Sequence, residues 1–291
     1  MTMHSTLVSL LKCPHSHEPL SLDGNQLMSN QHMYPIVNGI PVLLPQSSNE
    51  NTFKMEYMEH YTLEHERSDY FAELICHAQA DDERRVHEYI ISQVPKHTKH
   101  ILDVGSGGAW VAKHFCPKGV NVTSFDITLH NVSKALQTFP YSNHTGVVGD
   151  ALNLPIQENS LDCIIASEVI EHTVEPSLFV ARLFQALKPN GVLIVTTPYK
   201  EVIRMETCVH CNCETPRNAH LHSFDAQKLN SYTPIRGKFE YRTFGNKALI
   251  LLRSYFMTRI LPFSLWKLID GMVSVPINRK AHILAKYSKI S

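Results

Sequence analysis

Three aspartates in the middle of the chain each accompany an apolar segment that is expected to form a strand. Asp103 lies in ILDVG, Asp126 ends VNVTSFD, and Asp150 ends TGVVGD. In an open parallel sheet, ligands bind in the crevice at the carboxyl ends of the strands. Carboxylates at that edge can accept hydrogen bonds from ammonium, amino and hydroxyl groups. The three acids therefore favour a ligand that carries such donors.

The segment ILDVGSGGAW, at 101–110, places glycines at a strand-to-helix turn. Glycines there let a ligand approach the backbone closely and leave the N-terminus of the next helix open. A dinucleotide-binding fingerprint has the pattern G-x-G-x-x-G. Gly105 and Gly107 match its first two glycines, but Trp110 stands at the position of the third. Asp103 would also face a pyrophosphate with like charge. S-adenosylmethionine fits better, because it carries a sulfonium, an ammonium and a carboxylate but no phosphate.

Each acid can be matched to one part of that cofactor. Asp103 is expected to serve the ammonium, directly or through water, while the glycine turn receives the carboxylate. Asp126 can accept both ribose hydroxyls, and Asp150 can receive the adenine amino group. The predicted cofactor-binding residues are Asp103, Gly105, Ser106, Gly107, Asp126, Ile127, Asp150, Ala151, Leu152 and Ser167.

The segment SEVIEH follows the fourth predicted strand and supplies the candidate catalytic residues Glu168, Glu171 and His172. Their spacing of i, i+3 and i+4 would bring them to one face in one helical turn. Methyl transfer from a sulfonium is an in-line displacement, so the enzyme must align a nucleophile and share its proton. His172 could be the general base, or the three side chains could hold a divalent cation that lowers the pKa of an acceptor hydroxyl. A purely structural helix start is the remaining interpretation.

These side chains require a scaffold, and residues 99–200 alternate strand and helix patterns. Apolar runs such as HILDVG and GVLIVTTP lack strict alternation and are separated by amphipathic segments such as SLFVARLFQALKP. This pattern predicts a parallel sheet covered on both faces. We therefore expect a doubly wound, Rossmann-like α/β domain over 53–291, with insertions at about 201–222 and 246–277. A small β segment is expected at 1–46.

The motifs LDVGSGGA, FDIT, GDALNLPIQENSLDCIIASEVIEH and LKPNGVLIVTTP, in this order and spacing, resemble the class I S-adenosylmethionine-dependent methyltransferases. The subgroup that the chain resembles most is that of the type-11 and ubiquinone-biosynthesis enzymes, over about 83–235. Ala109 stands where many relatives carry a third glycine. The resemblance implies S-adenosylmethionine as the cofactor. Glu-x-x-Glu-His with a later histidine, here His220 or His222, is similar to the Mg²⁺ or Mn²⁺ site of ubiquinone-type O-methyltransferases and of small-RNA 3′-end 2′-O-methyltransferases.

Two further segments could hold zinc. A zinc loop or a set of reduced thiols is expected from the cluster Cys208, Cys211, Cys213, His220 and His222. If His220 served zinc, it could not also serve a catalytic cation. Residues 10–45 resemble the zinc-ribbon activators of tRNA and protein methyltransferases through LKCP and YPIVNGIPVLLP, but Ser16 replaces the expected second cysteine. His15, His17 or His32 could compensate. The segment can also pack on its neighbour without metal.

The strands GKFEYRTFG and HILAKYSKI flank an apolar insertion. Arg253, Arg259 and Lys267 interrupt it, so it cannot span a bilayer. The preferred interpretation is a lid that excludes water from the active site. The alternatives are an interfacial helix pair over 248–275 that meets a lipid-linked acceptor at a membrane surface, and a dimer contact.

Charge and composition limit the function classes. The chain has 27 Lys plus Arg and 27 Asp plus Glu, and this balance argues against nucleic acid as a partner. With neither a signal peptide nor a transmembrane stretch in the sequence, a cytoplasmic location is expected. We expect methyl transfer from S-adenosylmethionine to a small-molecule or lipid-linked acceptor at oxygen. The alternatives are methylation of RNA or protein and a non-catalytic scaffold. Trp110 disfavours a nicotinamide-dependent oxidoreductase, and the oligomeric state stays open.

Overall fold

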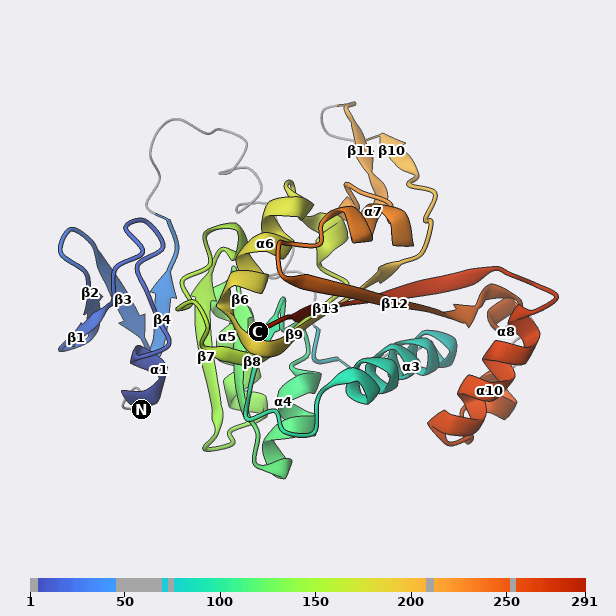
Figure 1. Cartoon of the computed structure of the whole chain (residues 1–291), viewed down its shortest axis with the longest axis horizontal. Coiled ribbons are helices and arrows are strands. Elements are labelled where there is room, and N and C mark those ends of the chain that lie inside the picture. Colours follow the sequence, from blue (N-terminus) through green and yellow to red (C-terminus); the bar gives the residue numbers. More distant parts are fainter. Residues whose placement is uncertain (1–4, 46–69, 73–75, 208–211, 252–254) are drawn as a thin grey trace.

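The computed structural model describes residues 5–45, 70–72, 76–207, 212–251 and 255–291. Its main feature is an eleven-stranded sheet with the order β1-β2-β3-β4-β7-β6-β5-β8-β9-β13-β12 (Figure 1). The central strands are β5 (His100–Val104), β6 (Asn121–Asp126), β7 (His144–Gly149), β8 (Leu161–Ser167) and β9 (Leu187–Pro198). All pairings among these five strands are parallel. The predicted doubly wound α/β fold is confirmed.

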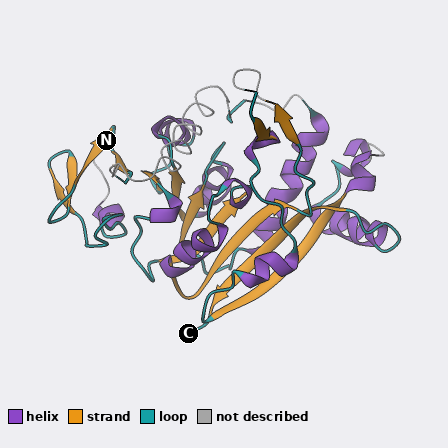
Figure 2. Cartoon of the chain, turned by 90° about the horizontal axis from the view of Figure 1, so that it is seen from above, coloured by secondary structure: helices purple, strands orange, loops and turns teal. Residues whose placement is uncertain are grey.

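Helices cover both faces of this sheet (Figure 2). They are α3 (His77–Gln93), α4 (Trp110–Phe115), α5 (Leu129–Thr138), α6 (Pro176–Ala186) and α7 (Ala226–Ser231). Short 3-10 helices are η1 (Cys116–Lys118), η2 (Ala151–Asn153), η3 (Ile170–His172) and η4 (Arg217–Ala219). Successive residues of β8 enter different apolar clusters, since Ile164 packs with α6 while Cys163 and Ile165 pack with α3 and α4. Burial on both faces explains why the strands read as continuous apolar runs.

The N-terminal segment forms a small module at one end of the sheet. Its elements are α1 (Ser5–Val8), β1 (Ser21–Asp23), β2 (Gln26–Met28), β3 (Met33–Val37) and β4 (Ile40–Leu43). Tight turns join β1 to β2 and β3 to β4 in antiparallel pairs. Strand β4 pairs in parallel with β7, so that Val42 lies opposite Val148. The module therefore extends the central sheet, and its apolar residues join the core that contains α6.

The C-terminal segment forms the other end of the sheet. Strands β12 (Gly237–Asn246) and β13 (Lys280–Lys289) pair antiparallel, and β13 also pairs antiparallel with β9. The segment between them contains α8 (Lys247–Leu251), α9 (Tyr255–Thr258) and α10 (Phe263–Ser274). These helices lie at the opposite end of the molecule from the N-terminal module (Figure 1). A short hairpin of β10 (Met205–Thr207) and β11 (Glu214–Pro216) stands apart from the main sheet. No helix in the described part of the chain combines the length and apolar character needed to cross a membrane.

Candidate functional site

The glycine turn after β5 has the backbone geometry that requires glycine. Gly105 and Gly107 have φ values of 65° and 44°, in the left-handed region. A Cβ on Gly105 would lie 2.6 Å from Val169 Cγ2, so a side chain there would displace the loop after β8. Ala109 caps α4 with a left-handed φ of 52°. Glycine adopts that conformation without strain, and this accounts for the third glycine in the family pattern.

A crevice opens above this turn at the carboxyl ends of the strands. It consists of two cavities that share Tyr70, Gly105, Gly107 and Glu168 as lining residues. One cavity is also lined by Asp126, Ile127, Asp150, Ala151 and Leu152, and the other by Asp103, Ser106 and Ser167. All ten residues predicted to bind the cofactor therefore line this crevice.

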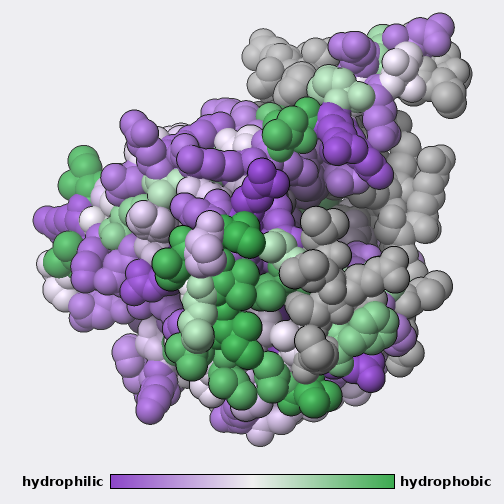
Figure 3. Space-filling model, turned by 90° about the vertical axis from the view of Figure 1, so that its right-hand side faces the viewer, coloured by the Kyte–Doolittle hydropathy of each residue, from purple (hydrophilic) through white to green (hydrophobic). Residues whose placement is uncertain are grey.

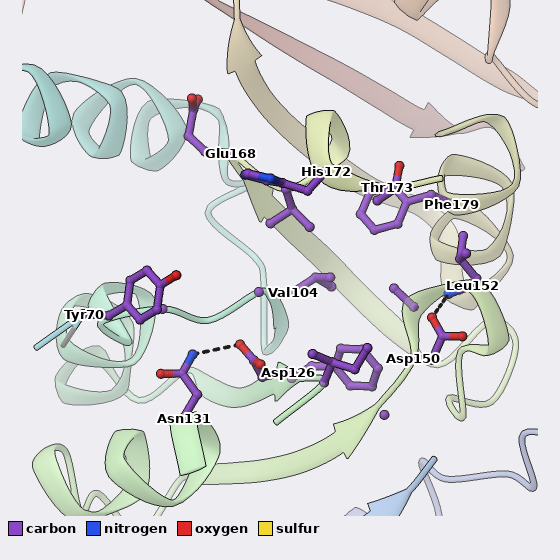
Figure 4. Close-up of a pocket in the computed structure, with 17 residues that line it drawn as sticks. Tyr70, Val104, Asp126, Asn131, Asp150, Leu152, Glu168, His172, Thr173 and Phe179 are labelled. Carbon is purple, nitrogen blue, oxygen red and sulfur yellow. Dashed lines mark hydrogen bonds between the residues drawn. The ribbon is translucent and has the colours of Figure 1, made fainter. Parts of the chain in front are cut away.

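Hydrogen bonds within the chain fix two of the three aspartates in the crevice. The Asp126 carboxylate accepts hydrogen bonds from Thr128 N at 3.0 Å and from Asn131 Nδ2 at 2.9 Å (Figure 4). Asp150 caps η2 and accepts a hydrogen bond from Leu152 N at 2.9 Å. Each carboxylate is held at the end of its own strand by the segment that follows it. The two acids are therefore positioned before any ligand binds.

Asp103 differs, because it is buried without a full set of partners. Its Oδ2 atom and the Oγ atom of Ser106 have no hydrogen-bond partner among the described residues. Burial, and secondarily the Asp126 carboxylate, raise the pKa of Asp103 well above its usual range. Buried polar groups without partners are costly. A ligand with an ammonium group would satisfy both atoms and would favour the charged carboxylate.

The turn that contains the candidate catalytic residues is not the single α-helical turn that the spacing predicts. Glu168 lies outside η3, with a left-handed φ of 55°, and its N–H donates to Thr196 O. Glu168 and His172 line the crevice. Glu171 is fully buried and lines neither cavity. The i, i+3, i+4 spacing fails here because the positive φ at Glu168 redirects the chain before η3 begins.

Glu171 belongs instead to a cluster with His172 and His220. Ligand atoms of Glu171, His172 and His220 all lie within 4.8 Å of one another. Both carboxylate oxygens of Glu171 are buried without a hydrogen-bond partner among the described residues. Burial, and secondarily the nearby Glu168, raise the pKa of Glu171 well above its usual range. These three side chains form what we call the Glu–His cluster.

The loop before α7 brings His220 to this cluster. Leu221 N and His222 N both donate to the backbone oxygen of Glu171, at 2.8 and 3.3 Å. His220 Nδ1 lies 2.6 Å from Glu201 Oε2, and His172 Nδ1 lies 3.3 Å from Ala219 O. An oxygen acceptor on one ring nitrogen is typical of histidines that bind metal through the other. Of the two later histidines, His220 is the one in the cluster, and His222 is not part of it.

The predicted zinc sites are only partly described. Cys208 and Cys211 lie outside the described residues, and Cys213 is exposed. The zinc loop stays a prediction. In the N-terminal module, Cys13 is buried with Tyr34 Oη at 3.2 Å and His32 Nδ1 at 3.8 Å. Among the described residues of this module, no group of three candidate ligands converges as the Glu–His cluster does.

Sequence reasoning missed several residues that line the crevice. Asn131 lies in the first turn of α5, five residues after Asp126, and this position could have suggested it. Thr173 follows directly on the catalytic segment, while Tyr70 carried no local signal. His282 on β13 has Nε2 at 2.9 Å from Asp82 Oδ2 and Nδ1 at 3.9 Å from Glu168 Oε1. Only the antiparallel pairing of β13 with β9 brings it there.

The apolar insertion does not form the lid that the sequence suggested. No described residue of 246–277 lines either cavity of the crevice. The insertion packs instead against α3, where Arg85 donates to Thr258 O at 2.6 Å and to Leu261 O at 3.2 Å. Trp266 on α10 lies in the same core as Tyr89 on α3. Packing against α3 buries one side of the insertion away from the crevice.

Comparison with known proteins agrees with this geometry. Residues 102–195 match a family model described as a methyltransferase domain. The chain is 37% identical over 119 residues to a ubiquinone biosynthesis O-methyltransferase of Rickettsia canadensis, covering 38% of this chain and 49% of that protein. The homologue from Rickettsia felis is 34% identical over 119 residues, with 38% and 48% covered. The match thus spans about half the length of these curated relatives.

Solved structures show the same fold. An S-adenosylmethionine-dependent methyltransferase from Mesorhizobium loti superposes with a TM-score of 0.51 at 16% identity, covering 72% of this chain and 100% of that chain. The cyclase SpnF gives a TM-score of 0.51 at 15% identity, with 72% and 80% covered. The fold is that of a Rossmann-like domain. Residues 102–195 thus match a methyltransferase domain, within a chain that has the fold of an S-adenosylmethionine-dependent methyltransferase.

Proposed function

We propose that this chain transfers a methyl group from S-adenosylmethionine to a hydroxyl oxygen of a small-molecule or lipid-linked acceptor. The observation that carries this proposal is the position of the Glu–His cluster. His172 belongs to the cluster and also lines the crevice beside Glu168. Figure 4 shows Glu168 and His172 across the pocket from Asp126 and Asn131. The acceptor would lie between these two sides, with its hydroxyl directed at the methyl group.

The proposed cofactor contacts follow from the positioned acids. Asp126 receives the ribose hydroxyls, and Asp150 receives the adenine amino group beside Leu152. Asp103 and Ser106 face the ammonium end, where their unpartnered atoms lie. The open backbone of the glycine turn accommodates the carboxylate. This arrangement directs the sulfonium toward the side of the crevice that carries Glu168 and His172.

The Glu–His cluster fits a divalent cation. A buried carboxylate without partners and two imidazoles form a mixed oxygen and nitrogen ligand set for a divalent cation, and the carboxylate oxygens are ligands that Mg²⁺ and Mn²⁺ accept. When bound, such a cation would polarise an acceptor hydroxyl and lower its pKa. Glu171, His172 and His220 would hold it, with Glu201 orienting the His220 ring. The positive charge of the cation would also offset the free-energy cost of burying the charged Glu171 carboxylate.

Glu168 is placed to accept the hydroxyl proton. It lines both cavities, and burial is the main cause that raises its pKa above the usual value, with His282 opposing this shift. A carboxylate with a raised pKa is a better general base near neutral pH. The neighbouring His282 has its Nδ1 atom 3.9 Å from Glu168 Oε1. If no cation binds, His172 takes the role of base instead.

The relatives support oxygen as the methylated atom. The two curated relatives from Rickettsia are named ubiquinone biosynthesis O-methyltransferases. A phenolic hydroxyl has an unperturbed pKa near that of tyrosine, about 10, and therefore needs the help that a cation or a base supplies. Equal numbers of acidic and basic residues give RNA no general electrostatic attraction. The similarity to SpnF, which is described as a cyclase, shows that the fold alone does not fix the reaction.

The test compares Glu171→Gln with the unchanged chain, using a phenol with a short isoprenoid tail as acceptor. Glu171 lines neither cavity, so S-adenosylhomocysteine should bind both proteins equally in calorimetry. Methyl transfer, followed with radiolabelled S-adenosylmethionine, should fall by about a hundredfold or more in the variant. A chelator should abolish turnover, and Mg²⁺ or Mn²⁺ should restore it. Turnover that survives both the chelator and Glu171→Gln would dismiss the cation and leave His172 as the base.

A further inference from the structure

Helix α10 is apolar on two opposite faces. Its inner face carries Trp266, which is buried against Tyr89 on α3. Its outer face follows a helical repeat whose members are all exposed large apolar side chains: Leu265 (43%), Leu268 (59%), Met272 (64%) and Val275 (86%). A helix that is apolar all round is normally buried on every side. Here the inner face is covered by α3, while the four residues of the outer face are exposed.

The outer face of α10 continues into a larger apolar patch. Ile260 and Ile277, at the two ends of this helical segment, are also exposed. Figure 3 views the molecule from the side where α8 and α10 lie, and apolar residues gather there on the surface. Contiguous exposed patches of this kind mark interaction sites in soluble proteins. We call Ile260, Leu265, Leu268, Met272, Val275 and Ile277 the outer patch.

The exposed charges of the segment that carries the outer patch are of one sign. Residues 246–280 contain six basic residues and a single acid, Asp270. Asp270 is buried and lies 2.9 Å from Lys280 Nζ, so it contributes no exposed negative charge. The exposed charged residues of the described part of this segment are Lys247, Arg259, Lys267 and Arg279. This local excess stands out because the whole chain has a formal net charge of zero.

The outer patch cannot be buried by turning the insertion inward, because the inner side is already filled. Arg85, at 2% exposed, holds Thr258 O and Leu261 O, and its guanidinium lies 4.9 Å from the Trp266 ring. Phe263 packs edge-on against Tyr89. The insertion is thus anchored with its outer patch facing away from the protein.

We propose that the outer patch and its basic rim bind the surface of an anionic lipid bilayer. Stable binding at a membrane surface needs two signals, an apolar face that enters the interface and basic side chains that attract anionic headgroups. The segment that carries the outer patch supplies both, since its exposed charged residues are all basic. A second copy of the chain is a poorer occupant, because a twofold contact would place the same basic rim against itself.

Helix α3 connects this surface to the crevice. Arg85 holds the insertion, and one turn earlier on the same helix Asp82 lies 2.9 Å from His282, which lines the crevice. A bilayer bound at the outer patch would therefore lie beside the helix that borders the site. The role of this placement in presenting a lipid-linked acceptor to the crevice rests on the proposed function. The membrane binding itself does not rest on it.

The test is co-sedimentation of the full chain with vesicles. Vesicles of equal parts phosphatidylcholine and phosphatidylglycerol should bind the protein, and vesicles of phosphatidylcholine alone should bind it much more weakly. The double variant Leu268→Glu/Met272→Glu should lose at least about tenfold in affinity. Arg259→Gln and Arg279→Gln should each lose about fivefold, with a weaker dependence on salt.

The matched control is Leu22→Glu/Met33→Glu, which adds the same charge at exposed apolar residues of the N-terminal module. This control should bind vesicles like the unchanged chain. Equal binding by both double variants, or no binding by the unchanged chain, would overturn the proposal. The proposal would also be overturned by a different pair of results. In these, light scattering shows a dimer that Leu268→Glu/Met272→Glu dissociates, and vesicles bind neither the unchanged chain nor the variant. Affinity for S-adenosylhomocysteine, measured on the same samples, should stay constant and separates this result from failure of the cofactor site.

Discussion

The two ends of the sheet carry additions that are attached in different ways. The N-terminal module joins the sheet through the β4–β7 pair, and its apolar residues share one core with Leu152 beside Asp150. The C-terminal insertion joins through α3, and it leaves an apolar patch on its far side. The core of the first addition is continuous with the core of the domain. The second addition exposes the outer patch, a group of large apolar side chains on one helix face.

This difference separates support of the cofactor site from contact with the surroundings. Backbone hydrogen bonds tie the module to the loop after η2: Lys12 N donates to Pro155 O, and Gln157 N donates to Leu10 O. Changes in the module should therefore reach the adenine side of the crevice. The insertion contributes no described residue to the crevice, so changes there should affect stability or docking and leave cofactor affinity intact.

Removal of the inner anchor of the insertion should have the largest effect on stability. Trp266→Ala leaves a cavity between α10 and α3 and should lower the free energy of unfolding by about 3–5 kcal/mol. Chemical denaturation followed by circular dichroism measures this change. S-adenosylhomocysteine affinity at a temperature where the variant is folded should be unchanged. A large loss of affinity would contradict the separation of the two regions.

A core substitution in the N-terminal module should act on both stability and binding. Leu11 is buried and forms a bridge to Ile156. Leu11→Ala should cost about 2–4 kcal/mol of unfolding free energy, and it should weaken S-adenosylhomocysteine binding severalfold because Leu152 packs in the same core. Calorimetry of the folded variant checks the second effect. Unchanged affinity would mean that the module is only an appendage.

Acid should lower the free energy of unfolding through His87, which lies on α3, the helix that also holds the insertion. His87 on α3 stacks on Trp110 with ring centroids 3.9 Å apart, and burial, helped by His114, lowers the pKa of His87 to about 4. Because the folded state excludes the proton, the stabilisation is present above the unfolded pKa near 6.5 and is lost as the pH falls toward 4. The loss between pH 7 and about pH 5 should reach up to about 2 kcal/mol.

The control for this prediction is His87→Phe, which keeps an aromatic ring on Trp110 but cannot titrate. Its free energy of unfolding should change less over the same pH range than that of the unchanged chain. Identical pH dependence in both proteins would show that His87 does not carry the effect.

The smallest stability effect is expected at the outer patch. Leu268→Glu and Leu22→Glu both replace an exposed leucine, so each should change the free energy of unfolding by less than about 0.5 kcal/mol. The two variants should differ in vesicle binding and not in stability. A large destabilisation by Leu268→Glu alone would indicate that the outer patch is packed against this chain.

Much of the fold could be predicted because its signals are local. Buried runs such as HILDVG and the helix with Phe179 and Leu183 read directly as elements of a parallel α/β sheet. The acids at the ends of β6 and β7 follow from the same reading, since a strand and the residue after it are adjacent in sequence. The resemblance of the linked motifs then pointed to the class.

The rest depends on contacts between distant segments. No local pattern distinguishes His220 from His222 as the partner of Glu171, because the choice depends on how the loop docks on η3. The left-handed backbone at Glu168 and the arrival of His282 on β13 are likewise set by tertiary packing. The insertion was expected over the crevice because its apolar content is the same whether it covers a site or packs on α3.

Calorimetric titration of S-adenosylhomocysteine into the unchanged chain and into Asp126→Ala tests the cofactor crevice most directly, with NADH as the competing nucleoside ligand. The account predicts micromolar binding of S-adenosylhomocysteine to the unchanged chain, a loss of tenfold or more in Asp126→Ala because two hydroxyl hydrogen bonds to a carboxylate disappear, and no binding of NADH. Binding of NADH, or equal affinity of the two proteins for S-adenosylhomocysteine, would contradict it.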